Sequence, residues 1–303
     1  MINRSELKTE QQNNNSKNID SMSIANILQI INGEDHKISS IIEKSISKIK
    51  NIVQYTLKSV KSGGRVFYIG AGTSGRLGVL DASELRPTFS LENNIFIALI
   101  AGGDKALRNS VEGAEDDKQS IINELKLYNI TDKDTVIGIS CSGAANYVVS
   151  GLSYAKKEKA KTVYIVTNPK PLYMVKVDIL LILDTGPEIL AGSTRMKAGT
   201  ATKMVLNMIS TTTMIKLGKV YGNLMVDLMA VNKKLCDRGT RIISQVRGIS
   251  HEEAALLLKK ANYSVKCAIV MSFLNCSLKK SQKELELSGG FLSKVINGQE
   301  KII

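Results

Sequence analysis

The sequence predicts an α/β protein with a doubly wound, parallel, five-stranded sheet. Five short apolar runs are rich in β-branched residues and are bounded by Gly, Asp or Asn-Pro, as buried strands are: 65–70, 95–103, 134–140, 161–166 and 178–183. Helical patterns separate the first four runs, which indicates crossover connections and parallel pairing. The gap before the fifth run, 167–177, is too short for an ordinary crossover helix.

The remaining elements are predicted by helical periodicity and turn residues. Residues 1–20 have the polar, Asn-rich composition of a chain tail. Apolar residues recur every three or four positions from Ile38 to Val60, which predicts one helix within 33–61, ended by Gly63 and Gly64. The other expected helices are 77–85 (closed by Pro87), about 145–158, 195–217, 224–236, 251–261, 264–278 and 281–287.

These patterns divide the 303 residues into three segments. We expect N-terminal helices after a polar start at 1–32, the α/β domain at 33–237, and a small helical C-terminal subdomain at 238–303. No run reaches the roughly 18 uninterrupted apolar residues of a membrane span. The N-terminus has no apolar core of a signal peptide. We therefore expect a cytoplasmic protein with no membrane partner.

The counts of His and Cys exclude several kinds of chemistry. The chain has two His, in polar surroundings, and four Cys with no Cys-x-x-Cys pair. We therefore expect no metal site, no iron–sulfur cluster and no Ser-His-Asp triad. Catalysis would depend on carboxylates, hydroxyls, Lys, Arg and backbone groups.

The formal net charge of +13 is uneven, because residues 231–303 hold 13 Lys and Arg against 6 Asp and Glu. Such a surface suits a nucleic acid or an acidic partner. However, the chain has no Trp and only 5% aromatic residues, so bases would find few side chains on which to stack. We interpret the charge as a solvated face and expect no nucleic-acid partner.

The most conspicuous motif runs from Gly70 to Gly75, directly after the first predicted strand, and fits Gly-x-Gly-x-x-Gly. A dinucleotide site also needs an acidic residue about 20 residues on, for the ribose. The first acid after the second strand, Asp104, comes 29 residues after Gly75. We therefore expect no nicotinamide or flavin cofactor.

Hydroxyl groups in two loops favour a phosphate instead. Gly72, Thr73, Ser74 and Gly75 form a turn that opens a helix, and backbone N–H groups at such a helix end bind anions. The third strand ends in a similar loop that contains Ser140 and Ser142. Both loops leave the carboxyl edge of the sheet, where ligands of such folds bind. We expect them to form one phosphate cradle, although each loop alone is also ordinary turn chemistry.

Two carboxylates lie near these loops in the sequence. Glu84 is in the helix that the first loop opens, and Glu115 follows the second strand. Two carboxyls in different surroundings can divide acid and base roles. An acidic run such as 112–117 is equally typical of a solvated helix start. A third anion-binding candidate is the helix start with Ser193 and Lys197, for which a plain N-cap is an equal alternative.

These loops resemble the sugar isomerase (SIS) domain of phosphosugar isomerases and sugar-phosphate-binding regulators. Over the whole chain, the sequence resembles the N-acetylmuramic acid 6-phosphate etherase family, from Thr9-Glu10 to Gly289-Gly290-Phe291. The motifs that carry the resemblance are GAGTSGRLGVLDASE (70–84), LIAGG (99–103), VEGAED (111–116), GPE (186–188), GSTRMKAGTA (192–201) and GKVYGNLMVD (218–227).

The resemblance implies that 33–237 is an SIS domain, that the protein is a homodimer, and that it needs no cofactor. It implies a lyase that removes D-lactate from N-acetylmuramic acid 6-phosphate in cell-wall amino-sugar recycling. Glu84 would be the proton donor and Glu115 the second essential carboxylate. Thr73, Ser74, Ser140 and Ser142 would hold the sugar phosphate.

The chain departs from the family at one loop. The family commonly reads SGRTPYV where residues 142–148 read SGAANYV, so the expected Arg and Thr are missing, and with them a Thr hydroxyl at 145 that would donate to the phosphate. The alternative function is a non-catalytic SIS regulator that binds a sugar phosphate. The presence of both Glu84 and Glu115 favours the enzyme, because a sensor has no need of the pair.

Overall fold

The computed structural model describes residues 4–91, 95–228, 230 and 232–300. The chain forms two compact units. The first comprises Met1–Ala82 and Asn94–Ser210, and the second comprises Ser83–Asn93 and Thr211–Ile303. No helix of the described residues is both long enough and apolar enough to cross a membrane.

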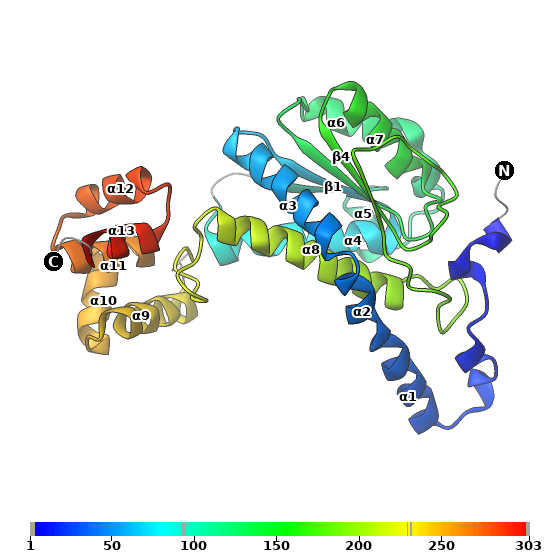
Figure 1. Cartoon of the computed structure of the whole chain (residues 1–303), viewed down its shortest axis with the longest axis horizontal. Coiled ribbons are helices and arrows are strands. Elements are labelled where there is room, and N and C mark those ends of the chain that lie inside the picture. The colour runs from blue at the N-terminus through cyan, green and yellow to red at the C-terminus, as the bar shows by residue number, and fades with distance from the viewer. Residues whose placement is uncertain (1–3, 92–94, 229, 231, 301–303) are drawn as a thin grey trace. The chain divides into compact units, whose positions relative to one another are not determined.

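The first unit contains a sheet of five parallel strands in the order β2-β1-β3-β4-β5 (Figure 1). The strands are β1 Val66–Gly70, β2 Phe96–Ile100, β3 Thr135–Ile139, β4 Lys161–Val166 and β5 Ile179–Ile182. All five predicted strands are confirmed, as is the α/β fold class. No helix lies between β4 and β5, as the short gap predicted.

The helices also follow the predicted pattern in most places. They are α1 Ile24–Asp35, α2 Lys37–Glu43, α3 Ile46–Lys61, α4 Gly72–Phe89, α5 Lys105–Arg108, α6 Lys118–Leu127, α7 Asn146–Lys157, α8 Lys197–Lys216, α9 Lys233–Arg247, α10 His251–Lys260, α11 Val265–Leu274, α12 Leu278–Leu287 and α13 Leu292–Glu300. Short 3₁₀ turns occur at Arg4–Glu6, Lys8–Glu10, Asn14–Ser16, Ile19–Ser21 and Ala114–Asp116.

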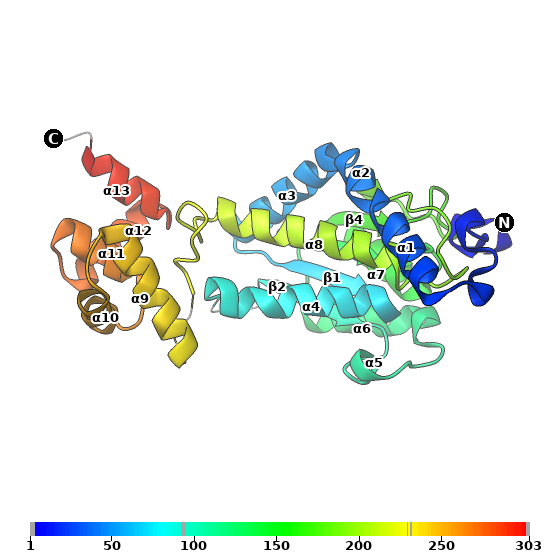
Figure 2. The same ribbon diagram turned by 90° about the horizontal axis from the view of Figure 1, so that it is seen from below.

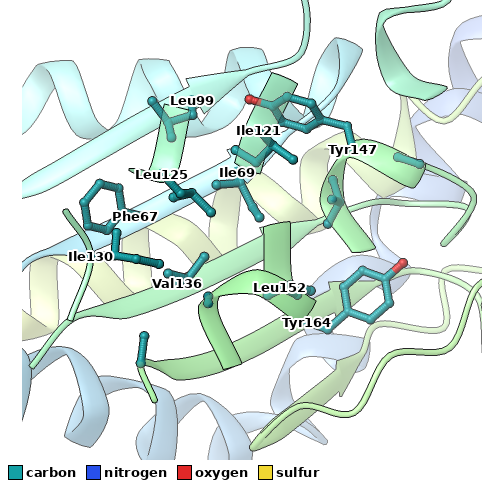
Figure 3. Close-up of a cluster of buried hydrophobic side chains, with 14 of the residues drawn as sticks. Phe67, Ile69, Leu99, Ile121, Leu125, Ile130, Val136, Tyr147, Leu152 and Tyr164 are labelled. Carbon is teal, nitrogen blue, oxygen red and sulfur yellow. The ribbon is translucent and has the colours of Figure 1, made fainter. Parts of the chain in front are cut away.

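Helices cover both faces of the sheet. In Figure 1, α6 and α7 lie over one face, and in Figure 2, α3, α4 and α8 lie across the other. The core under α6 and α7 is continuous and fully buried, because the central strands are apolar on both faces. Figure 3 shows part of it, including Phe67, Ile69, Val136, Tyr147 and Leu152.

Three helix predictions need correction. The single helix predicted within 33–61 is interrupted near His36 and Lys44. Apolar periodicity did not reveal these breaks, because it reports which residues are buried and not whether the helical hydrogen bonds are continuous. Pro87 lies inside the last turn of α4 instead of closing it. Among the described residues of 224–236, the helix begins at Lys233, and Val226 and Leu228 are buried outside any helix.

The N-terminal segment is not a loose tail over its described residues. Thr9 is buried, and its hydroxyl accepts a hydrogen bond from Asn168 Nδ2 at 2.9 Å. The hydroxyl of Ser16 donates to the carbonyl of Ile189 at 2.7 Å. Gly192 N–H donates to the carbonyl of Thr9 at 2.8 Å. These bonds fasten the segment over the loops that follow β4 and β5.

The second unit has its own core, formed around α9, α10, α11 and α13. The ammonium of Lys266 is buried and lies 2.9 Å from Asp227 Oδ2, and Lys219 Nζ lies 3.0 Å from the same oxygen. Gly218 adopts a positive φ of 78°, and a side chain there would collide with the carbonyl of Gly290. The boundary predicted between 237 and 238 falls inside α9.

Candidate functional site

The loop after β1 depends on two glycines. A Cβ at Gly70 would lie 2.7 Å from the amide nitrogen of Gly75, and a Cβ at Gly75 would lie 2.6 Å from Ile100 Cγ1. Only glycine permits so close an approach of strand, loop and helix. The loop therefore turns directly from β1 into α4, and Thr73 and Ser74 lie in the first turn of that helix.

The loops after β1 and β3 meet. Ser74 Oγ lies 3.5 Å from Cys141 Sγ, and both side chains are buried. Cys141 stands between Ser140 and Ser142, whose loop turns back through a bond from Gly143 N–H to the carbonyl of Ser140. The structure thus brings together the two hydroxyl-rich loops. Their role in phosphate binding stays a prediction.

The side chain of Ser142 is partly engaged, because its Oγ accepts a bond from the N–H of Ala144 at 3.2 Å. Ala145 is the N-cap residue of α7 and provides no side-chain cap. Since the first N–H groups of a helix have no intrahelical partner, this helix start presents donors next to the Ser140–Ser142 loop.

Glu115 lies in the short turn Ala114–Asp116, and its side chain is exposed. The next residue, Asp116, accepts a hydrogen bond from Asn146 Nδ2 at 3.2 Å. Asp117 then caps α6 by accepting from Gln119 and Ser120 N–H. The turn that carries Glu115 is therefore fixed beside the start of α7.

Glu84 is exposed on α4, and a buried cluster holds that helix one turn earlier. Asp81 accepts hydrogen bonds from Tyr68 Oη at 3.1 Å, Asn207 Nδ2 at 2.6 Å and Ser210 Oγ at 3.0 Å. Burial raises the pKa of Asp81, while these three donors act in the opposite direction. The cluster ties α4 to β1 and α8, and our reading of the sequence did not single it out.

The start of α8 is occupied by the protein's own groups. Glu188, which is fully buried, accepts from the N–H groups of Lys197 at 3.1 Å and Ala198 at 2.9 Å. The ammonium of Lys197 lies 2.6 Å from Glu34 Oε2, and both side chains are buried. Ser193 lies in the loop just before the helix and is half-buried. The contribution of Ser193 and Lys197 to ligand binding stays a prediction.

Among the cavities at the surface of the first unit, two are lined by described residues. One of about 720 Å³ lies along α6, α7 and residues 172–174, and its lining includes Lys118, Lys126 and Lys157. The other, of about 650 Å³, lies between the N-terminal segment, α2 and the loop after β5. In the described residues, no three His, Cys, Asp or Glu side chains are grouped as metal ligands.

Two profiles of known domain families match ranges of the chain that contain these loops. The sequence profile of the glucokinase regulatory protein N-terminal SIS domain matches residues 48–156. The profile of the SIS domain matches residues 110–211. Both matched ranges include the Ser140–Ser142 loop, and the first also includes the Gly70–Gly75 loop.

Curated relatives match almost the whole chain. An N-acetylmuramic acid 6-phosphate etherase of Geobacillus sp. is 47% identical over 290 residues, which is 96% of this chain and 98% of that protein. One of Pseudothermotoga lettingae is 46% identical and covers 93% of this chain and 94% of its own length. Among solved structures, a phosphoheptose isomerase from Francisella tularensis is similar with a TM-score of 0.48 and 17% identity, over 63% of this chain and 100% of its own.

Proposed function

The chain belongs to the N-acetylmuramic acid 6-phosphate etherase family, and on that premise we propose that it is a carbon–oxygen lyase that cleaves the D-lactyl ether of N-acetylmuramic acid 6-phosphate. The products are D-lactate and N-acetylglucosamine 6-phosphate. The observation that carries this proposal is the 47% identity over 96% of the chain. The meeting of Ser74 with the Ser140–Ser142 loop supports it, because a phosphosugar needs such a group of donors.

The reaction needs one base and one acid. In the open-chain sugar, the C1 aldehyde acidifies the proton on C2. A carboxylate removes that proton, the C3–O bond breaks, and a carboxylic acid protonates the ether oxygen as lactate leaves. Water then adds across the C2–C3 double bond, with its hydroxyl on C3 and its proton on C2. We assign the base to Glu115 and the acid to Glu84.

The phosphate would be held by Thr73, Ser74, Ser140 and Ser142, with Gly72 and Gly75 shaping the first loop. The missing Thr of the family motif is offset by backbone groups. Because Ala145 leaves α7 without a side-chain cap, the first N–H groups of that helix can donate to a phosphate oxygen. The substituted loop therefore keeps donors, although it has lost two side chains.

We further propose that the enzyme works as a homodimer. Ser74 and Glu84 lie in the same helix, ten residues apart, which is about 15 Å along its axis. Phosphorus and C3 of the sugar are joined by five bonds, so they lie at most about 7 Å apart. A dimer in which Glu84 of one copy serves the phosphate cradle of the other accommodates this spacing. Ile24 and Leu28, exposed on α1, offer apolar surface for such an association.

The reaction is tested by incubating the purified chain with N-acetylmuramic acid 6-phosphate and measuring D-lactate. Lactate release is expected, and the unphosphorylated sugar should be a poor substrate. Binding of the phosphosugar without lactate release would instead identify a non-catalytic sugar-phosphate sensor.

Sharing of the site between copies is tested by mixing two impaired variants and measuring lactate release at a substrate concentration well below KM, where weakened binding and slowed chemistry both reduce the rate. Ser74→Ala chains and Glu84→Gln chains, unfolded together and refolded, form mixed dimers. If Glu84 acts on the other copy's cradle, each mixed dimer has one site with neither substitution, and lactate release recovers. If both groups act within one chain, each site contains the substitution of its own chain. No site is then free of substitutions, and mixing restores nothing.

A further inference from the structure

The cavity between the N-terminal segment, α2 and the loop after β5 has an excess of positive charge. Its lining contains four lysines, Lys8, Lys37, Lys44 and Lys197, and two acids, Glu34 and Asp184. We refer to it as the β5 cavity. It lies at the carboxyl end of the edge strand β5, because Asp184 and Thr185 in its lining closely follow that strand.

Ion pairs account for three of the four lysines. Glu34 Oε2 lies 2.6 Å from Lys197 Nζ, and Glu34 Oε1 lies 2.5 Å from Lys37 Nζ. Lys8 Nζ lies 2.6 Å from Asp184 Oδ2. One carboxylate thus serves two ammonium groups, which leaves a local charge of one. These pairs fasten the N-terminal segment to the loop after β5, and α1 to the start of α8.

Two polar groups of the cavity lining, those of Lys44 and Thr185, take no part in these ion pairs. Within the described residues, Lys44 forms no ion pair, so the β5 cavity has two positive charges in excess. Thr185, which is only 5% exposed, lines the cavity, and its buried Oγ1 has no hydrogen-bond partner in the part of the chain that the structure describes. A buried hydroxyl without a partner costs free energy, so a missing partner is the physical explanation to seek.

We propose that the β5 cavity is a second anion site, which binds a phosphate group. A phosphate dianion matches the two positive charges in excess, and its oxygens accept hydrogen bonds from lysine ammonium and threonine hydroxyl groups. Side-chain amides of Gln12 and Asn14, which are exposed in the same lining, provide further donors. A cavity of about 650 Å³ has room for a small phosphorylated molecule.

This site is distinct from the cradle of the proposed reaction. In the sheet order, β5 is two strands from β3 and three from β1. At about 4.8 Å per strand, the ends of these strands lie roughly 10–14 Å apart. None of the four hydroxyl residues of the cradle, Thr73, Ser74, Ser140 and Ser142, lines the β5 cavity. The proposal does not depend on the reaction assigned above.

The test is equilibrium dialysis of the full chain against radiolabelled inorganic phosphate. Ser74→Ala serves as the background, because it weakens the cradle alone. In that background we expect saturable binding with a dissociation constant of about 1 mM or lower. Adding Lys44→Gln or Thr185→Val should weaken the binding by about tenfold or more. Lys50→Gln, which removes an exposed lysine outside the cavity, should leave it unchanged.

Absence of saturable binding in the Ser74→Ala chain would overturn the proposal, and so would unchanged binding in both cavity variants. Lys44 is exposed, so its substitution leaves folding intact even if Thr185→Val does not. Competition identifies the source of the phosphate. Displacement by N-acetylglucosamine 6-phosphate, but not by N-acetylglucosamine, indicates a phosphosugar effector, whereas binding that resists both indicates free phosphate.

Discussion

Ser74 Oγ lies 3.5 Å from Cys141 Sγ, and this contact joins the first turn of α4 to the end of β3. Burial raises the pKa of the Cys141 thiol, so the sulfur stays protonated at neutral pH. A thiol is a weak hydrogen-bond acceptor, and the Ser74 hydroxyl therefore keeps most of its capacity to donate. The contact holds Ser74 in place but leaves its hydroxyl able to donate a hydrogen bond. The proposed phosphate cradle requires such a donor.

Ser74→Ala should mainly weaken substrate binding. The substitution removes a hydrogen bond to a charged group, which is worth about 1.5–3 kcal/mol. We expect KM for N-acetylmuramic acid 6-phosphate to rise at least tenfold, with a smaller change in kcat. Ser153→Ala on α7, an exposed serine whose hydroxyl bonds only within its helix, is the matched control. Equal KM values for the two variants would exclude Ser74 from the cradle.

The strands could be predicted from the sequence because each is a continuous apolar run, and such runs occur where both faces of a sheet are covered. The meeting of the two Gly-Ser loops followed from parallel topology, which places the ends of neighbouring strands at one edge. The helix prediction before Lys233 was wrong for a related reason. Val226, Leu228 and Ala230 belong to the second core, but periodicity alone does not separate a buried helix from a buried non-helical stretch.

Other parts of the site depend on contacts that periodicity does not encode. Thr9 forms a hydrogen bond with Asn168, and Ser16 forms one with Ile189, each across more than 150 residues of sequence. The local sequence of this polar N-terminal segment therefore did not indicate its structural role. Asp81 reads as one acid on a helix, and its burial follows only from the donors on β1 and α8. Tertiary partners decided both cases.

Lys197→Met should destabilise the fold strongly. The substitution leaves Glu34, whose side chain is 3% exposed, without its buried counter-charge. Removing one partner of a buried ion pair typically costs about 3–5 kcal/mol. Lys37→Met removes the other lysine of Glu34, but that side chain is 55% exposed, and the cost should be about 1 kcal/mol or less. Urea unfolding of the two variants provides the comparison. Equal losses of unfolding free energy would show that the buried Glu34–Lys197 pair stabilises the fold no more than the exposed Glu34–Lys37 pair does.

The same pair predicts a stability that depends on pH. Burial alone would raise the pKa of Glu34, but hydrogen bonds from Lys197, Lys37 and Asn15 prevail and lower it from 4.5 to about 2. A lowered pKa stabilises the folded state above pH 4.5, and that contribution is lost as the pH falls towards 2. The difference in unfolding free energy between wild type and Glu34→Gln should therefore shrink over this window. A difference that stays constant from pH 5 to pH 2 would contradict the ionised pair.

The two carboxylates of the proposed reaction can be separated by hydrogen exchange. Glu84→Gln keeps the side-chain size but cannot readily protonate the leaving oxygen. We expect lactate release to fall by about 10²–10⁴-fold. Exchange of the C2 hydrogen with D₂O should persist, because the aldehyde acidifies that proton and Glu115 still removes it. Glu115→Gln should lose both exchange and lactate release, since no base remains.

NMR of the C2 position in D₂O, with lactate measured on the same samples, decides the assignment. Glu112→Gln is the matched control, because that exposed glutamate belongs to the same acidic run and accepts a hydrogen bond from the nearby Ser110 hydroxyl. It should retain both exchange and lactate release. Exchange that persists in Glu115→Gln but not in Glu84→Gln would reverse the two roles. Full lactate release by both variants would place the acid and the base on other residues, since removal of either group must slow C–O cleavage if both act in it.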